Sequence, residues 1–265
     1  MSDGKYAFEK SKIIQGDCLE KMQNIPDKSI DAIICDLPYG TTQCKWDSVI
    51  DMNALWAEYK RVIKDNGVIA LFASQPFTSV LISSNLKMFK YSYVWDKITK
   101  TNHLNAKKQP LRQTEDICVF YKKQPTYKPQ GLIECEVSNF RPNHFKYKKG
   151  DKVYGEQKEH SNKSSYTNYP SNLLQYSNGN HNSLHPTQKP VALFEYLIKT
   201  YTNEGDIVLD NTAGSGTTGE ACINLNRDFI LIEKDPNYYE VIKERVGKIF
   251  KNYGLDLQPL LNEQM

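Results

Sequence analysis

Short apolar runs alternate with longer amphipathic stretches through the first third of the chain. The run DAIICD is apolar without interruption, which is typical of a parallel strand covered on both faces. Leu55, Tyr59 and Val62 have the spacing of one helical face. This pattern predicts strands at residues 13–16, 31–36, 67–73, 91–95 and 117–121, and helices at residues 18–24, 52–64 and 77–85.

The same alternation returns near the C-terminus after a long aperiodic stretch. Residues 123–184 are rich in Asn, Ser, Tyr, Lys, Gly and Pro and show no hydrophobic period, so this segment is either disordered or a mobile binding segment. After it, the pattern predicts helices at 191–201, 217–225 and 236–250 and strands at 206–210 and 229–233. The whole pattern predicts an α/β fold with a mostly parallel sheet and helices on both faces.

The net charge of +3 conceals an uneven distribution. Residues 97–189 carry 16 Lys/Arg against 7 Asp/Glu, a net charge of +9, and also all five histidines. The remaining residues carry 18 against 24, a net charge of −6. A basic middle on an acidic scaffold is typical of a polyanion-binding protein, although a solvated lysine-rich loop gives the same count.

Neither a metal site nor a membrane span is predicted. The six cysteines form no C-x-x-C pair and have no histidine at zinc-ligand spacing, so we expect buried free thiols, at Cys35 and Cys118 in particular. No apolar run approaches the roughly 18 residues of a membrane span, and the N-terminus is polar. We therefore expect a cytoplasmic protein.

A glycine-rich turn follows the strand predicted at 206–210. Gly214, Gly216 and Gly219 form a G-x-G-x-x-G pattern that opens a helix, and Glu233 ends the next predicted strand, where an acid can hold two ribose hydroxyls. The pattern alone fits NAD, flavin or S-adenosylmethionine (SAM), or a turn without a ligand. Asp210 favours SAM, because an acid before the turn attracts an ammonium and repels a pyrophosphate.

A second turn, Asp-Leu-Pro-Tyr-Gly, follows the predicted strand at 31–36. Such turns lie where open α/β sheets bind their ligands. An exocyclic base amine is a weak nucleophile, but two acceptors, the Asp36 carboxylate and the Leu37 carbonyl, can orient its lone pair toward a methyl donor. Pro38 stiffens the turn and Tyr39 can stack on a base, which must be flipped out of a duplex to arrive there. An ordinary Pro-Tyr-Gly turn is the alternative.

These motifs resemble the SAM-dependent amino-methyltransferases of DNA. Their catalytic motif is Asp/Asn/Ser-Pro-Pro-Tyr/Phe/Trp, and here Leu37 replaces the first proline. The catalytic turn precedes the glycine turn, which is the permuted order of the beta class of this family. Further similar segments are Gly16-Asp17-Cys18, Trp95-Asp96-Lys97, Arg112-Gln-Thr-Glu115 and His185-Pro-Thr-Gln-Lys-Pro190.

The resemblance implies a Rossmann-like SAM-dependent methyltransferase fold with circularly permuted motif order. It implies a catalytic domain at 1–122 and 185–265 and an inserted DNA target-recognition region at 123–184. It also implies catalytic roles for Asp36, Leu37, Pro38 and Tyr39. The implied SAM-binding residues are Asp17, Cys18, Asp36, His185, Lys189, Asp210, Asn211, Thr212, Ala213, Gly214, Ser215, Gly216, Thr217, Thr218, Glu233 and Lys234.

Double-stranded DNA is the partner that the basic middle and the resemblance imply together. The candidate DNA-binding residues are Lys97, Lys100, Asn102, His103, Lys107, Lys108, Arg112 and Arg141. The resemblance also implies a bacterial or phage-encoded enzyme. It leaves open whether the protein forms a homodimer and whether a cognate restriction endonuclease accompanies it.

Adenine N6 is the target that the resemblance favours, because the cytosine-N4 members usually begin the motif with Ser where this chain has Asp36. Both amines need the same two acceptors, so a cytosine-N4 methyltransferase is the first alternative. A dinucleotide-dependent oxidoreductase and a non-catalytic DNA-binding module are the others. The oxidoreductase leaves the Asp-Leu-Pro-Tyr turn and the basic insert unexplained.

Overall fold

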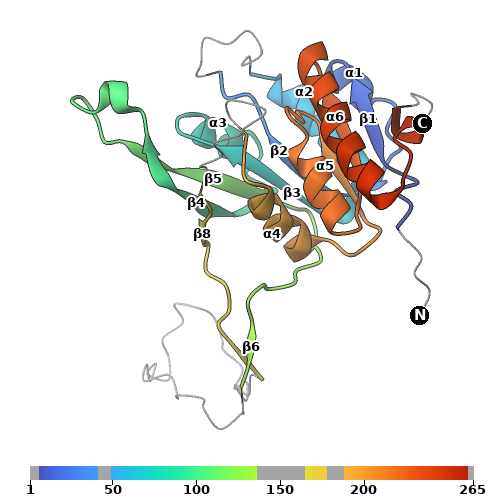
Figure 1. The fold of residues 1–265 in the computed structure, drawn as a ribbon. Helices are drawn as coiled ribbons and strands as arrows, with labels where there is room; N and C mark the ends of the chain where they lie inside the picture. Colours follow the sequence, from blue (N-terminus) through green and yellow to red (C-terminus); the bar gives the residue numbers. More distant parts are fainter. Residues whose placement is uncertain (1–5, 41–48, 136–164, 178–187, 262–265) are drawn as a thin grey trace. The chain divides into compact units, whose positions relative to one another are not determined.

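A computed structural model describes residues 6–40, 49–135, 165–177 and 188–261. Its main feature is an eight-stranded sheet, in the order β1-β10-β9-β2-β3-β5-β4-β8 (Figure 1). The strands are β1 (Lys12–Gln15), β2 (Ile30–Asp36), β3 (Ile63–Ala73), β4 (Phe89–Thr101), β5 (Arg112–Phe120), β8 (Leu173–Gln175), β9 (Ile207–Asp210) and β10 (Asp228–Glu233). The pairs from β1 to β3 are all parallel, whereas β5 runs antiparallel to both β3 and β4. The mostly parallel sheet is the one expected.

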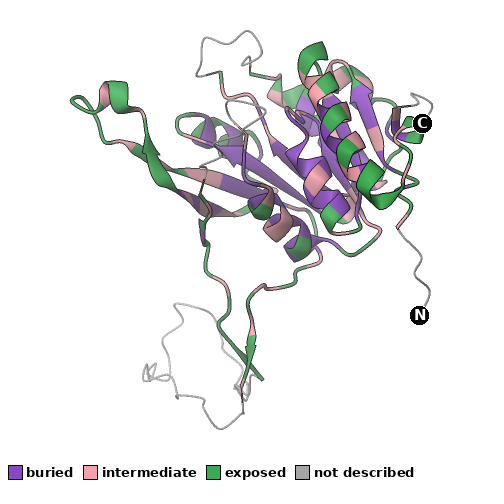
Figure 2. Ribbon diagram, viewed as in Figure 1, coloured by how far each residue is buried: buried purple, intermediate pink, exposed green. Residues whose placement is uncertain are grey.

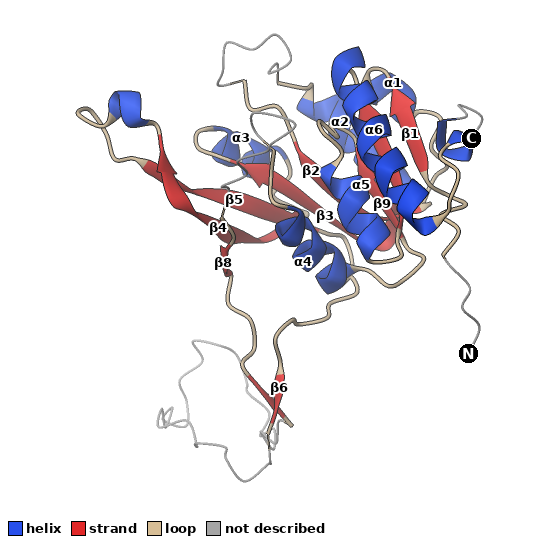
Figure 3. Ribbon diagram, in the orientation of Figure 1, coloured by secondary structure: helices blue, strands red, loops and turns tan. Residues whose placement is uncertain are grey.

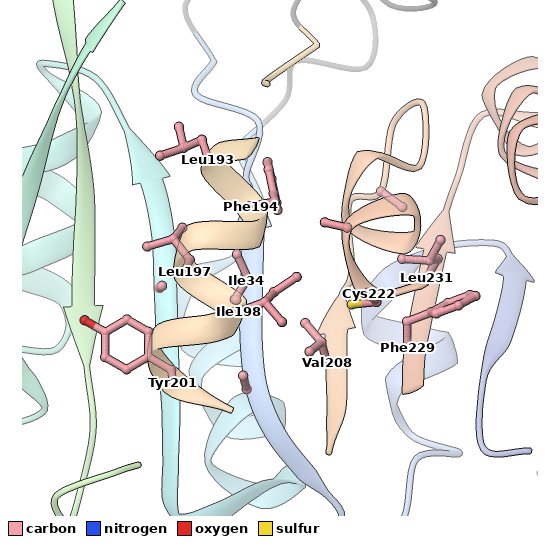
Figure 4. Packing of buried hydrophobic residues seen from close by; sticks show 14 of the residues in the cluster. Ile34, Leu193, Phe194, Leu197, Ile198, Tyr201, Val208, Cys222, Phe229 and Leu231 are labelled. Carbon is pink, nitrogen blue, oxygen red and sulfur yellow. The ribbon is translucent and has the colours of Figure 1, made fainter. Parts of the chain in front are cut away.

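Helices cover both faces of the sheet (Figure 3). They are α1 (Cys18–Met22), α2 (Met52–Val62), α3 (Phe77–Ser84), α4 (Val191–Tyr201), α5 (Thr217–Asn224) and α6 (Pro236–Tyr253). Successive residues of β2 point to opposite faces, so Ile34 joins the core under α4, α5 and α6, while Ile33 joins the core under α1, α2 and α3. Figure 4 shows the first of these cores, where Leu197 and Val208 pack near Ile34.

Burial of the strands on both faces explains the uninterrupted apolar run in β2. The central strands are buried along most of their length (Figure 2). Cys35 and Cys118 are both fully buried and carry free thiols, as expected. Among the described residues, no helix is both long enough and apolar enough to cross a membrane.

The two strands predicted at 91–95 and 117–121 are longer than the apolar pattern indicates. Together they form a β4–β5 hairpin that projects beyond the helices and carries a short 3₁₀ helix, η1 (His103–Asn105), between its strands (Figure 1). Polar and basic side chains cover this outer part, so hydrophobic periodicity fades there although the backbone pairing continues. A second 3₁₀ helix, η3 (Gln258–Leu261), lies near the C-terminus.

The chain divides into two compact units. The first contains the large sheet and residues up to 128 and from 172, and the second spans residues 129–171. Within the second, β6 (Ile133–Glu134) and β7 (Tyr166–Thr167) pair antiparallel, and the Asn168 side chain donates to the carbonyl of Gly131. This unit lies within the 123–184 segment, whose later residues include β8, which pairs with β4 in the large sheet and buries Leu174.

Candidate active site

Three acids lie at the carboxyl ends of neighbouring parallel strands. Asp36 ends β2, Asp210 ends β9 and Glu233 ends β10, and the parallel register places all three at one edge of the sheet. The two turns expected from sequence to carry cofactor and chemistry are therefore side by side.

The Asp36 carboxylate is held at both oxygens. The Tyr39 hydroxyl donates to Oδ1 at 2.7 Å, and the Lys189 ammonium donates to Oδ2 at 2.6 Å. The side chain of Asp36 is 24% exposed, so the carboxylate remains accessible from one side. Each carboxylate oxygen has a second lone pair, which leaves acceptor capacity for an incoming N–H group.

The Tyr39 ring is fixed on its other side by an aromatic neighbour. It stacks on Phe77 at the start of α3, with ring centroids 5.3 Å apart and an interplanar angle of 23°. Burial raises the pKa of Tyr39 well above its ordinary value, so its hydroxyl stays protonated and acts as a donor to Asp36. Leu37, which stands where the resembling family has proline, is 2% exposed and fills the core under α1, α2 and α3.

A direct hydrogen bond joins the two turns. The Thr212 hydroxyl donates to the main-chain carbonyl of Asp36 at 3.0 Å, and its N–H donates to Asp210 Oδ1 at 3.1 Å. The other oxygen of Asp210 accepts from the Thr218 hydroxyl in α5. Asp210 is 3% exposed, and this burial raises its pKa to about 7. A cation bound at this edge of the sheet would favour the ionised form.

The glycine-rich turn has one open side. Gly214 adopts a φ of +53°, and a Cβ placed on it would have no atom within 4 Å. Gly216 has a φ of +77° and caps α5, while a Cβ on Gly219 would lie 2.8 Å from Leu231 Cδ1. Gly219 therefore permits close packing of α5 on β10, and Gly214 leaves space for a ligand to approach the backbone.

Glu233 shapes the same turn from the neighbouring strand. Its carboxylate accepts from the N–H groups of Gly214 at 2.7 Å and Asp235 at 2.8 Å, and burial raises its pKa. Beside it, Lys234 forms an ion pair with Asp17 at 3.1 Å, and Asp17 caps α1 by accepting from the N–H of Leu19. These contacts bring the expected cofactor residues of β1–α1 and β10 together.

The Asn211 amide is held inside the site by residues that the sequence did not point to. Its Oδ1 accepts from the Tyr59 hydroxyl at 2.6 Å and from the Cys35 thiol at 2.9 Å. Its Nδ2 is buried and has no hydrogen-bond acceptor among the described residues. Tyr59 lies on α2 and gives no sequence signal beyond an ordinary core position.

Arg245 and Gln188 anchor the glycine turn from outside it. Arg245 on α6 donates to the Ser215 carbonyl at 2.9 Å and forms an ion pair with Glu220 at 2.6 Å. The Ser215 hydroxyl donates to the Gln188 side chain at 3.1 Å. Of the other candidates, Cys18, Ala213 and Thr217 lie buried at this edge, and His185 falls outside the described residues.

Lys97 and Lys189 both lie in buried ion pairs. Lys97 is 5% exposed, and its ammonium is paired with Glu115 at 3.1 Å, so this placement does not support a contact with DNA phosphate. Lys189 has its ammonium on Asp36, another expected cofactor residue, and also 3.3 Å from Glu115. Sequence spacing gave no indication of these pairs, because each joins residues that only strand pairing or the folded chain brings together.

The other basic candidates lie on the β4–β5 hairpin. Lys100, His103, Lys107, Lys108 and Arg112 are all exposed there, and Asn102 is half-buried. Residues 97–114 contain no acidic side chain. The hairpin is therefore an exposed basic arm, which suits a polyanion. Arg141 falls outside the described residues.

The residues present at the sheet edge fit SAM. Glu233 stands where an acid can hold ribose hydroxyls, Gly214 leaves its side of the turn open, and Asn211 Nδ2 is an unused buried donor. The acids Asp36 and Asp210 suit the two positive charges that SAM carries. In the part of the chain that the structure describes, no group of three or more His, Cys, Asp or Glu side chains is placed to hold a metal ion.

Comparison with known proteins identifies the family. Residues 30–244 match the DNA methylase family. The DNA adenine methyltransferase YhdJ of Escherichia coli (strain K12) is 31% identical over 89% of this chain and 83% of its own length. The type II methyltransferase M.HpaI of Haemophilus parainfluenzae is 29% identical over 91% of this chain and 76% of its own length.

A solved structure agrees with the fold. The crystal structure of the M1.HpyAVI–SAM complex aligns with a TM-score of 0.59 and 27% identity, covering 89% of this chain and 98% of that chain. The cytosine-N4-specific PvuII DNA methyltransferase aligns with a TM-score of 0.62 at 17% identity, which supports the fold alone. The chain therefore belongs to the DNA methylase family, the SAM-dependent amino-methyltransferases that act on DNA.

Proposed function

We propose that the protein transfers a methyl group from SAM to the N6 amine of adenine in a flipped-out base of duplex DNA. The main support for this proposal is the hydrogen bond from Thr212 Oγ1 to the Asp36 carbonyl, because it joins the candidate catalytic turn to the candidate cofactor turn. The relative named as a DNA adenine methyltransferase, 31% identical, supports adenine as the target.

In this proposal Asp36 is the acceptor that orients the target amine. When bound, SAM supplies a methyl group on a sulfonium, which is a good leaving group. The Asp36 carboxylate accepts one N–H of the amine, and the Leu37 carbonyl accepts the other. Together they direct the nitrogen lone pair toward the methyl group and stabilise the positive charge that grows on nitrogen. The nitrogen–carbon bond forms as the sulfur–carbon bond breaks, the neutral thioether leaves, and the nitrogen then loses one proton to water. Pro38 stiffens the turn, and Tyr39, fixed by Phe77, supports one side of the base.

In this proposal the glycine-rich turn and the strand ends beside it bind SAM. Glu233 holds the ribose, Asp210 attracts the methionine ammonium, and the N–H groups at the start of α5 face the carboxylate. Asp17, Cys18 and Lys234 form the adenine side of the site. The remaining cofactor residues line or shape the glycine-rich turn: Asn211, Thr212, Ala213, Ser215, Thr217 and Thr218.

DNA binding falls to the exposed basic arm and to the region around 123–184. On the arm, Lys100, His103, Lys107, Lys108 and Arg112 neutralise phosphates, and Asn102 is within the same surface. Flipping of the target base gives it access to the recessed Asp36, because the exocyclic amine of a paired base is inaccessible. We place the second unit, residues 129–171, within the target-recognition region.

Restriction–modification is the proposed setting. Several relatives are named type II methyltransferases, M.HpaI among them.

The proposed oligomeric state is a homodimer, and the proposed location is the cytoplasm of a bacterium. Sedimentation of the purified protein with and without a DNA duplex tests the oligomeric state. A mass twice that of one chain is expected, and a single-chain mass at all concentrations would contradict the dimer.

Nucleoside analysis of methylated DNA tests the proposed function. Purified protein is incubated with SAM and duplex DNA that contains all short sequences, and the digested nucleosides are separated by mass spectrometry. N6-methyldeoxyadenosine is the expected product. N4-methyldeoxycytidine would replace adenine by cytosine as the target, and the absence of any methylated nucleoside would contradict the proposal. Omission of SAM is the control.

A further inference from the structure

Four charged side chains form a buried chain that starts at the candidate catalytic acid. Lys189 Nζ lies 2.6 Å from Asp36 Oδ2 and 3.3 Å from Glu115 Oε2, and Lys97 Nζ lies 3.1 Å from Glu115 Oε1. The side chains of Lys97, Lys189 and Glu115 are 6%, 8% and 14% exposed. Two ammonium groups alternate with two carboxylates, so the charges compensate one another.

Aromatic rings surround the Lys189 ammonium. Its Nζ lies 5.5 Å from the centroid of Phe72, 5.8 Å from that of Tyr39 and 5.9 Å from that of Trp95. Burial lowers the pKa of Lys189, but the carboxylates of Asp36 and Glu115 outweigh this effect and raise it, so the group is a cation at neutral pH. Ring faces attract a cation, which adds to the fixed position of the ammonium.

Lys189 lies in a segment that contacts both turns of the site. The segment leads into α4 through Pro190, which occupies the N-cap. Gln188 accepts from the Ser215 hydroxyl in the glycine-rich turn, while Lys189 donates to Asp36 in the catalytic turn. Adjacent residues thus tie the same short segment to the candidate cofactor and base-binding sides.

We infer that Lys189 is the positioning residue of Asp36 in methyl transfer, and that Glu115, itself held by Lys97, keeps Lys189 in place. The inference rests on the proposed function of Asp36. Lys189 binds Oδ2 and Tyr39 binds Oδ1, so rotation of the carboxylate plane is restrained. One lone pair on each oxygen remains to accept the target N–H.

The Lys189–Asp36 ion pair has two candidate roles, one in the chemical step and one only in the stability of the fold. A purely structural ion pair would stabilise the fold, but its removal would leave the rate of the chemical step unchanged. The two roles therefore make different kinetic predictions.

Single-turnover methylation by Lys189→Met separates these roles. Methionine replaces the aliphatic stem of lysine without its ammonium and suits the aromatic surroundings. At saturating SAM and DNA we expect the rate to fall about 100-fold, since a small misplacement of a catalytic group has an effect of this order. The dissociation constants for SAM and for DNA, measured by calorimetry and by fluorescence anisotropy, are expected to stay within about threefold of wild type.

Lys64→Met is the matched control. Lys64 Nζ lies 2.6 Å from Asp31 Oδ1, the same distance as the Lys189–Asp36 pair, but near the opposite end of β2. Its loss removes an equally short ion pair from the same strand and is expected to leave the single-turnover rate unchanged. An equal fall in both variants would overturn the inference, because the effect would then come from loss of stability.

The role of Glu115 is tested by combining substitutions. Glu115→Gln is expected to slow methylation less than Lys189→Met, and the double variant is expected to be no slower than Lys189→Met alone, because Glu115 acts through Lys189. A double variant that is slower than Lys189→Met by the full factor seen in Glu115→Gln would show that Glu115 does not act through Lys189. Glu115 keeps its ion pair with Lys97 in Lys189→Met, but the four-residue cluster then carries a net charge of −1. If this variant unfolds, the double variant restores the charge balance of the cluster and still gives the rate.

Other results overturn the inference while leaving the proposed function intact. A Lys189→Met variant with the wild-type rate at saturation excludes positioning. If the same variant also binds SAM more than tenfold more weakly, Lys189 is a cofactor ligand instead. Failure of the wild-type protein to methylate adenine under the same conditions would instead contradict the proposed function. Lys189→Arg, which keeps the charge, is expected to recover part of the rate.

Discussion

The ammonium of Lys189 lies 2.6 Å from the carboxylate of Asp36, although 153 positions of sequence separate the two residues. A second bond, from Thr212 to the Asp36 carbonyl, spans 176 positions. Both contacts converge on the end of β2, so the residue proposed to orient the target amine is held by its side chain and by its backbone.

Gly214→Ala is predicted to weaken SAM binding more than it destabilises the fold. The methyl group would enter the open side of the glycine turn, so we expect the dissociation constant for SAM to rise at least about tenfold, which corresponds to roughly 1.4 kcal/mol. The positive φ of the residue adds about 1 kcal/mol of backbone strain. Calorimetry measures the first effect and thermal unfolding the second.

Gly205→Ala is the control for backbone strain. Gly205 has a φ of +81°, and a Cβ there would meet only the Tyr6 hydroxyl at an ordinary 3.7 Å. The melting temperature of the Gly205→Ala variant is expected to fall about as much as that of the Gly214→Ala variant, and its affinity for SAM is expected to stay unchanged. Equal losses of SAM affinity in the two variants would show that the open side of Gly214 does not face the cofactor.

SAM binding is predicted to weaken in acid because of Asp210. Burial raises the pKa of this carboxyl to about 7 in the free protein, and Asp36 and Glu233 act in the same direction. An ammonium favours the ionised carboxylate, so below pH 7 the dissociation constant should rise about tenfold per pH unit. Calorimetry between pH 5 and 8 measures the dissociation constant for SAM. If the same pH dependence persists in Asp210→Asn, another group causes it.

The same pKa predicts the pH dependence of stability in the free protein. Because the folded pKa lies above the ordinary value of 3.8, the stabilising contribution of protonated Asp210 is complete below about pH 4 and is lost as the pH rises through 7. The difference corresponds to at most about 4 kcal/mol in the free energy of unfolding. Asp210→Asn is therefore expected to stabilise the free protein at pH 8 and to have little effect at pH 4, as denaturant unfolding would show.

The exposed lysines of the β4–β5 hairpin are predicted to contact DNA phosphates. Lys107 and Lys108 are exposed in a segment without acidic residues. Their double replacement by Ala should lower the slope of log affinity against log salt by about 1.8, at about 0.9 per phosphate contact. Lys248 and Lys251, exposed on α6, are the control pair. An unchanged slope in the hairpin variant would remove these residues from the DNA interface.

The family and the fold could be predicted from sequence because their signals are local. The central parallel strands contain apolar runs such as AIIC and VIALFA, and the two turns carry characteristic residues within a few positions of Asp36 and Gly214. The resemblance to amino-methyltransferases, the SAM cofactor and the mostly parallel sheet are confirmed by the family match and the structural relatives.

What sequence did not predict depends on contacts between distant segments. Lys97 looks like one more cation of a basic run, but its partner Glu115 lies on the neighbouring strand, and only strand pairing reveals the buried pair. Likewise, Leu173–Gln175 lies in an aperiodic stretch and is too short to show a period, yet it completes the sheet beside β4. Tyr59 reads as a core residue, and its hydroxyl contact with Asn211 requires the folded chain.

Asp36→Ala tests the central claim that methyl transfer takes place at the turn after β2. In this variant, calorimetry measures SAM binding and mass spectrometry measures N6-methyldeoxyadenosine after a single turnover on duplex DNA. We expect SAM binding within about tenfold of wild type, since the glycine turn and Glu233 remain, and a rate lowered about 100- to 1,000-fold, as for loss of a group that stabilises developing charge. Methylation at the wild-type rate would contradict the claim.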